Sequence, residues 1–237
     1  MAKQIILFLA ANPLGSDRLA LDQEARAIQV ELERSRHRDQ FELVTRWAAE
    51  PLDLLRELRR LRPTIVHFSG HAGPRIATCL PVSSSSSRDV SDSMDRSDGD
   101  REVGLLLHAS DAMPQLVSSA ALAETLRAAG ASVRLVVLSA CYSDSQAETL
   151  LAYVDCVVGM HGPISDDAAR SFALGFYGGL VDGESIAAAY DQGLAAISLV
   201  GICHLNRPKL KARNNKESDP LVELSTTGSR PSRRKKR

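Results

Sequence analysis

The sequence is poor in aromatic residues and lacks any long apolar segment. Only 4% of its 237 residues are Phe, Trp or Tyr, so the core must be built mainly from aliphatic side chains. No stretch approaches the roughly 20 apolar residues that a membrane-spanning helix needs. Met1 to Gln4 lead directly into a short apolar run, without a secretory signal. We therefore expect a cytoplasmic protein that makes no contact with a membrane.

Cysteines are few and widely spaced. None of Cys79, Cys141, Cys156 and Cys203 forms a Cys-x-x-Cys pair, and no Cys/His pair has the spacing of zinc ligands. We expect reduced thiols, no metal site and no cofactor. The first apolar run is followed by neither a Gly-x-Gly-x-x-Gly motif nor a phosphate-binding loop, so the sequence gives nucleotide binding little support.

Formal net charge is zero, but the charge is unevenly distributed. From Arg207 to Arg237, eleven Lys and Arg stand against three Asp and Glu, so this segment carries +8 and the remainder −8. Such a composition is typical of a solvated, disordered terminus. We therefore predict one domain over 1–205 and a basic, disordered tail over 206–237. The tail could touch nucleic acid or an acidic partner, although nothing else in the sequence supports such binding.

Short apolar runs alternate with helical patterns along the chain. Strands are predicted near 5–10, 41–47, 64–69, 104–108, 133–138 and 154–159. Helices are predicted at about 19–36, from Pro51, from Ser118 or Ser119 to Gly130, at about 144–152, and after Ser165 and Ser185. This alternation favours an α/β fold, with a mainly parallel sheet flanked by helices on both faces. The serine-rich segment at about 74–103 predicts a flexible insertion.

Two of the predicted strands end at residues that can perform chemistry. One runs into His71 and the other into Cys141. Because the carboxyl ends of parallel strands meet at one edge of a sheet, we expect these residues to lie together. An imidazole can then take the thiol proton, and the thiolate can attack a carbonyl. A free cysteine is, by itself, more often a small buried hydrophobe. Small neighbours leave room for backbone N–H donors to a substrate oxygen; these are Gly70, Ala72, Gly73 and Ala140.

The segments Val66 to His71 and Val137 to Ser143 resemble the two catalytic motifs of CHAT-domain peptidases. These are caspase-like cysteine peptidases of the clan that includes separase, metacaspases and gingipains. The resemblance covers roughly residues 4–200, apart from the insertion. It implies a caspase-like fold, with His71 as general base and Cys141 as nucleophile. It also implies an oxyanion site formed by the backbone N–H groups of Cys141 and Ala72, although the family usually has Gly at the position of Ala72.

The resemblance leaves substrate preference open. In related metacaspases an acidic residue two positions before the cysteine helps to bind a basic side chain, and here that position is Ser139. If the pocket takes Arg or Lys, Asp144 and Asp166 are the candidates to supply the charge. The competing interpretation is that both aspartates cap helices, since both lie at predicted helix starts.

The resulting hypothesis is a cysteine endopeptidase that cleaves a partner protein. Related peptidases usually act as effectors in bacterial defence or programmed cell death, so we also expect an activating partner protein. The main alternative is a non-catalytic caspase-like module for protein association, in which His71 and Cys141 would lie apart or be occluded. A weaker alternative is a flavodoxin-like ligand-binding domain with its pocket at Asn12 to Gly15.

Overall fold

A mainly parallel sheet forms the centre of the molecule. The computed structural model describes residues 3–74, 103–202 and 208–221. Six strands follow the order β2-β1-β3-β6-β7-β8, parallel throughout except for β8 at one edge. They are β1 (Gln4–Ala11), β2 (Phe41–Arg46), β3 (Ile65–Pro74), β6 (Leu135–Ser139), β7 (Cys156–Met160) and β8 (Pro208–Ala212). The fold class predicted from the sequence is confirmed.

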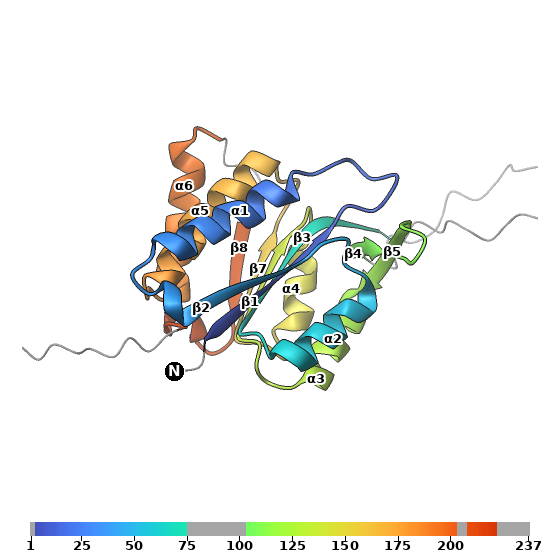
Figure 1. Cartoon of the computed structure of the whole chain (residues 1–237), viewed down its shortest axis with the longest axis horizontal. Helices are drawn as coiled ribbons and strands as arrows, with labels where there is room; N and C mark the ends of the chain where they lie inside the picture. Colours follow the sequence, from blue (N-terminus) through green and yellow to red (C-terminus); the bar gives the residue numbers. More distant parts are fainter. Residues whose placement is uncertain (1–2, 75–102, 203–207, 222–237) are drawn as a thin grey trace, which may run out of the picture.

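Helices cover both faces of this sheet (Figure 1). On one face lie α1 (Leu21–Arg34), α5 (Asp166–Val181) and α6 (Ile186–Leu199); on the other lie α2 (Pro51–Leu61), α3 (Ser119–Ala129) and α4 (Asp144–Leu150). Successive strand residues point to opposite faces, so β1 supplies Ile6 and Phe8 to one core and Leu7 and Leu9 to the other. Within the described ranges, no helix has the length and apolarity required to cross a bilayer.

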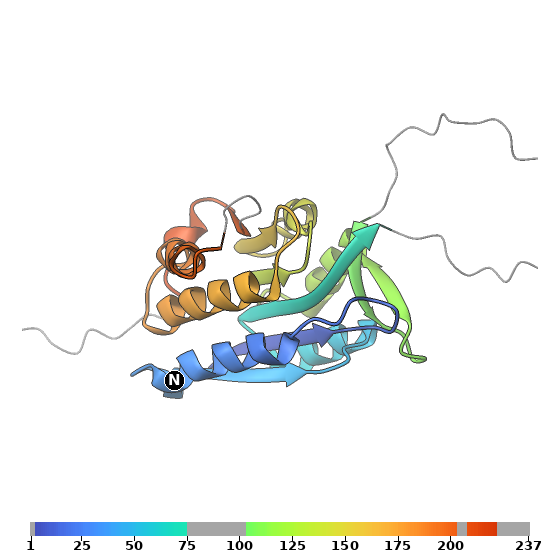
Figure 2. The ribbon, with the colours of Figure 1, turned by 90° about the horizontal axis from the view of Figure 1, so that it is seen from above.

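Strand β3 continues past the residue at which the sequence predicts its end. Its first half pairs with β1 and β6, whereas His71 to Pro74 pair antiparallel with β4 (Val103–His108), which in turn pairs with β5 (Pro114–Ser118). Figure 2 shows β3 running out of the main sheet toward β4 and β5. The sequence prediction stopped at Ser69 because small residues follow. In the structure, β4 pairs with that stretch. The backbone groups of the stretch are therefore hydrogen-bonded, although its side chains do not form the pattern that predicts a strand.

The predicted insertion lies almost entirely outside the described residues. Its two ends, Pro74 and Val103, are direct partners in the β3–β4 ladder. The described residues on either side of the predicted insertion thus adjoin one another at the end of this ladder.

The predicted boundary at residue 205 requires correction. Strand β8 pairs along its length with β7, Leu210 packs against the core, and Leu221 is 4% exposed. The hydroxyl of Tyr190 donates to the carbonyl of Pro208 at 2.7 Å. In this edge strand a lysine alternates with an apolar residue, so a strand of period two lies within the basic segment. Residues 222–237, also assigned to the tail, lie outside the described residues.

Candidate active site

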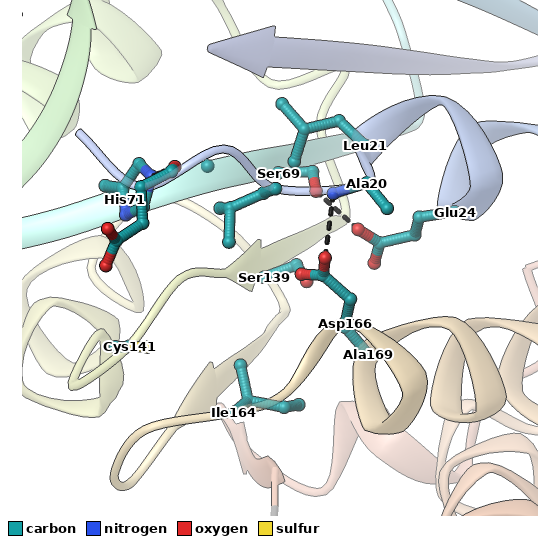
Figure 3. A pocket seen from close by; sticks show the side chains of 13 residues that line it. Ala20, Leu21, Glu24, Ser69, His71, Ser139, Cys141, Ile164, Asp166 and Ala169 are labelled. Atoms are coloured by element: carbon teal, nitrogen blue, oxygen red, sulfur yellow. Dashed lines mark hydrogen bonds between the residues drawn. The ribbon is translucent and has the colours of Figure 1, made fainter. Parts of the chain in front are cut away.

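A cavity of about 240 Å³ lies at the carboxyl ends of β3 and β6, and both His71 and Cys141 line it (Figure 3). The two strands are in register, so that Ser69 is the direct partner of Ser139. Each serine stands two residues before its candidate catalytic residue. The topology thus brings the two sequence motifs to one cavity, although they are about 70 residues apart in the chain.

The ring of His71 has one nitrogen already engaged. Its Nε2 lies 2.7 Å from the carbonyl oxygen of Asp17, in the segment between β1 and α1. A carbonyl oxygen can only accept, so this hydrogen bond requires the proton on Nε2 and leaves the Nδ1 lone pair free. No hydrogen bond joins His71 to Cys141 in the part of the chain that the structure describes. Catalytic contacts often tighten only when substrate is bound.

The backbone just before His71 leaves no space for a side chain. A Cβ atom on Gly70 would lie 2.6 Å from the carbonyl oxygen of Ala11 and 2.9 Å from the ring of Phe68. The requirement for glycine does not extend beyond His71, because Ala72 is an ordinary strand residue opposite Leu105 and does not have a positive φ. The alanine that stands where the family usually has glycine therefore carries no backbone strain here.

We predict that Gly70→Ala destabilises the protein by about 1–3 kcal/mol, the typical cost of overpacking. The new methyl group must push β3 away from β1 at the residue that precedes His71. Gly73→Ala is the matched control, because nothing lies within 4 Å of a Cβ atom at that position. Urea denaturation of both variants measures the difference. Equal free energies of unfolding would contradict the predicted close approach.

Cys141 lies in a short turn between β6 and α4 that is held by the hydrogen bonds of Ser143. The hydroxyl of Ser143 donates to the carbonyl of Leu138 at 2.9 Å and accepts from the N–H of Met160 at 2.9 Å. Tyr142 takes a left-handed conformation with φ of 58°, which is rare for a bulky residue and common at functional sites. Among the described residues, the N–H of Cys141 has no hydrogen-bond partner. It can therefore donate to a substrate oxygen at the cavity.

Comparison with known protein families gives the same assignment as the two motifs. The CHAT-domain family model matches residues 9–199, which is most of the chain and includes both His71 and Cys141. The chain belongs to the CHAT-domain family. CHAT domains form a caspase-like peptidase family, so the resemblance seen in the sequence is confirmed. No curated protein matches the chain.

Family membership also bears on the flavodoxin-like alternative. A second hollow, of about 380 Å³, lies on the other side of the β1–α1 connection and is lined by Asn12, Arg18, Trp47 and His108, among others. A flavodoxin-like protein was expected to place its pocket here. Because the CHAT fold is caspase-like, that alternative is set aside.

The cavity of this CHAT domain contains a buried acid that the sequence analysis did not identify. Glu24 on α1 is 5% exposed, and its Oε1 lies 3.2 Å from Nε2 of the buried His67. Burial raises the pKa of Glu24, but attraction to His67, the hydrogen bond from Ser69 and the nearby Ser139 hold it below its ordinary value overall. The available sequence signal was its position three residues after Leu21, which places it on the buried face of the helix.

His67 supports Glu24 from inside the core. Its Nδ1 lies 2.9 Å from the hydroxyl of Tyr177, and its ring stacks on Phe8 with centroids 4.8 Å apart. With 1% exposure and contacts at both ring nitrogens, His67 is a structural core residue. This agrees with its alternation with apolar neighbours in the sequence.

Of the two aspartates proposed for substrate binding, only Asp166 lines the cavity. Its Oδ2 accepts from the N–H of Ala20 at 2.8 Å, so the acid is held against the start of α1 (Figure 3). The N-cap of α5 is Ser165, whose side chain accepts from the N–H of Ala168, so helix capping does not account for Asp166. Its exposed carboxylate remains available to a ligand.

Asp144 does not line the cavity, and its carboxylate lies against basic side chains. Its Oδ1 lies 2.9 Å from Nζ of Lys211 on β8, while Oδ2 lies 3.4 Å from His161 and 3.6 Å from Lys209. Burial raises its pKa, but the bond and charge of Lys211, followed by His161 and Lys209, bring the pKa below its ordinary value. Asp144, the first residue of α4, thus links the turn that carries Cys141 to the edge strand.

We predict that Lys211→Met destabilises the protein by about 1 kcal/mol at pH 7. Because the pKa of Asp144 is lowered in the folded state, its contribution is present above its unfolded pKa of about 3.9. That contribution is lost as the pH falls through the folded value. The difference in unfolding free energy between wild type and variant should therefore shrink below about pH 4. Lys209→Met, at the longer distance, should show a smaller effect. A difference that stays constant between pH 3 and pH 7 would rule out this ion pair as its source.

Proposed function

We propose that this CHAT domain is a cysteine endopeptidase in which His71 is the general base and Cys141 the nucleophile. The observation that carries the proposal is that both residues line one cavity at the ends of paired strands. The main-chain oxygen of Asp17 supports it further, because it holds Nε2 and leaves Nδ1 as the proton acceptor. A backbone carbonyl thus orients the imidazole, the part that an acidic side chain plays in a triad.

In this mechanism the thiol proton of Cys141 passes to Nδ1 of His71, and the thiolate attacks the carbonyl carbon of the scissile peptide. The resulting oxyanion accepts from the N–H of Cys141, and Ala72 is the proposed second donor. The protonated imidazole then gives its proton to the leaving amine, and an acyl-enzyme thioester remains. Water, deprotonated by His71, hydrolyses the thioester and restores the thiol.

We further propose that the substrate is a partner protein and that a second partner triggers cleavage, as in an effector of bacterial defence or programmed cell death. The support is the family resemblance, together with a His71 that is hydrogen-bonded to Asp17 and not to Cys141. A trigger would have to bring the two side chains into contact. Incubating wild type and Cys141→Ala with the protein encoded beside this chain tests the proposal. The expected result is a new N-terminus in that protein with wild type only.

Cleavage by neither form, in that protein or in a broad peptide library, would favour the alternative of a non-catalytic association module. If neither form cleaves in the presence of a candidate activating partner, the peptidase proposal is excluded for that substrate and that partner. The cavity favours the enzyme over the module, because a module used only for association does not need a thiol and an imidazole in one cavity.

The charge on the cavity wall favours a basic substrate side chain. Asp17, Glu24 and Asp166 line the cavity, and no Lys or Arg stands among its described lining residues. We predict that Asp166→Asn lowers cleavage after Arg by about ten- to a hundredfold, because a charge-assisted bond contributes roughly 1.5–3 kcal/mol. The amide still accepts from Ala20, so the local fold is kept. Asp144→Asn is the control and should have no such effect. A wild type with no preference for Arg or Lys in a peptide library would contradict the basic pocket.

A further inference from the structure

Glu24 lies below the ends of the two strands that carry the candidate catalytic residues. In the view of Figure 3 its carboxylate stands on the far side of the cavity from His71 and Cys141, beside Ser69 and Ser139. The hydroxyl of Ser69 donates to Oε2 of Glu24, and Ser139, the direct ladder partner of Ser69, lines the same cavity. All three side chains are at most 5% exposed. One buried carboxylate thus lies beside a serine from each strand and accepts a hydrogen bond from the serine of β3.

The positions of the two serines give this arrangement its significance. Ser69 and Ser139 are direct partners in the parallel ladder between β3 and β6. Side chains two residues apart on a strand point to the same face, so His71 projects on the same side as Ser69. Cys141 follows Ser139 at the same spacing, in the turn that begins where β6 ends. Any change in the distance between the serines is thus passed to the residues that must exchange a proton.

The strand ladder alone does not fix that distance. The β3–β6 pairing ends at Ser69 and Ser139, while β3 leaves the sheet toward β4 immediately beyond. A buried carboxylate is stable only when it is hydrogen-bonded, and the buried serine hydroxyls likewise need an acceptor. Ser69 and Glu24 satisfy one another, Ser139 lies beside them, and His67, which contacts Tyr177, lies against the other oxygen of the carboxylate.

We propose that Glu24 is a positioning residue, which ties the ends of β3 and β6 together through Ser69 and Ser139 and so sets the approach of His71 to Cys141. The inference rests on the proposed dyad. Glu24 itself does not touch the reacting atoms. The proposal also accounts for the serine at position 139, because a hydroxyl donor is what the carboxylate on α1 requires there.

The test uses the reactivity of Cys141, which needs no knowledge of the substrate. Iodoacetamide alkylates the thiolate, and mass spectrometry of the Cys141 peptide follows the rate as a function of pH. If the dyad is formed, His71→Ala slows alkylation at pH 7. Glu24→Gln should then slow it by about tenfold and move the pH midpoint of the profile upward, since small misplacements at a catalytic pair have large effects. Ser69→Ala and Ser139→Ala should each act in the same direction, and the double variant should approach Glu24→Gln.

A matched serine elsewhere in the core distinguishes a positioning role of Ser69 and Ser139 from a purely structural one. Ser35 is 6% exposed and donates to the carbonyl of Val181 at 3.0 Å, at the far end of α1. Ser35→Ala should lower the melting temperature about as much as Ser69→Ala without changing the alkylation profile. If Glu24→Gln does not fold, the three serine variants carry the comparison.

Unchanged alkylation in the folded Ser69→Ala and Ser139→Ala variants, with a clear effect of His71→Ala, would overturn the positioning role and leave the dyad standing. If His71→Ala has no effect on alkylation either, the proposed dyad and the positioning role fall together.

Discussion

Cys141→Ala should lower peptide-bond cleavage by about 10³-fold or more, to the background rate, because the attacking sulfur is absent. His71→Ala should lower it by about 10²- to 10⁴-fold, the range that a general base contributes. Addition of imidazole should restore part of the rate to the His71 variant and none to the Cys141 variant. Single-turnover cleavage of a validated substrate measures these rates without interference from product release.

The chain offers a matched cysteine for this experiment. Cys156 is fully buried in β7, and burial, together with the neighbouring Asp155 and Glu217, raises the pKa of its thiol to about 12. A thiol of this kind is a poor nucleophile at neutral pH. Cys156→Ala should therefore keep the wild-type rate as long as the protein is folded. Loss of cleavage in the folded Cys156 variant, with cleavage retained in Cys141→Ala, would show that the nucleophile has been misassigned.

Ending the chain at residue 205 should destabilise the domain by on the order of 5 kcal/mol. The truncation removes β8, with its ladder to β7, the buried side chain of Leu221 and the lysine partners of Asp144. A buried leucine contributes about 1.5–3 kcal/mol and each hydrogen bond about 1 kcal/mol. For a protein of this size, the loss corresponds to a melting temperature lower by about 10–20 °C.

A chain that ends at residue 221 is the control, because it retains every contact described above. Circular dichroism of the two truncated proteins gives the comparison. If the chain that ends at residue 205 melts together with the longer one, β8 contributes nothing to the stability of the sheet and the boundary expected from the sequence is sufficient.

Much of the fold could be predicted because each main strand and helix has a recognisable pattern in its own segment of the sequence. Runs such as Ile5 to Ala10 contain only apolar residues, as strands buried on both faces do, and Ser165 and Ser185 mark helix starts by their capping side chains. The place of His71 and Cys141 in one cavity also followed from the sequence. It needs only the rule that parallel strands end at the same edge.

The features that were missed depend on contacts between distant segments. Strand β8 has a strongly basic sequence and becomes a strand only because β7 offers it an unpaired edge. Asp144 and Asp166 look alike in the sequence, since each begins a helix after a strand. Only the neighbouring lysines of β8 separate them, by occupying one and leaving the other exposed. Glu24 was overlooked for the same reason, because its partners come from β3 and β6.

The pairing of β8 with β7 also has a consequence for how the protein matures during synthesis. The segment that carries His71 is made first, and Cys141 follows about 70 residues later, which corresponds to several seconds at about 5–20 residues per second. Lys211, which binds Asp144 at the start of α4, follows only after a further interval of similar length. Until the ribosome has released β8, the turn that carries Cys141 therefore lacks this contact. The surroundings of Cys141 are complete only after the edge strand of the sheet has been made.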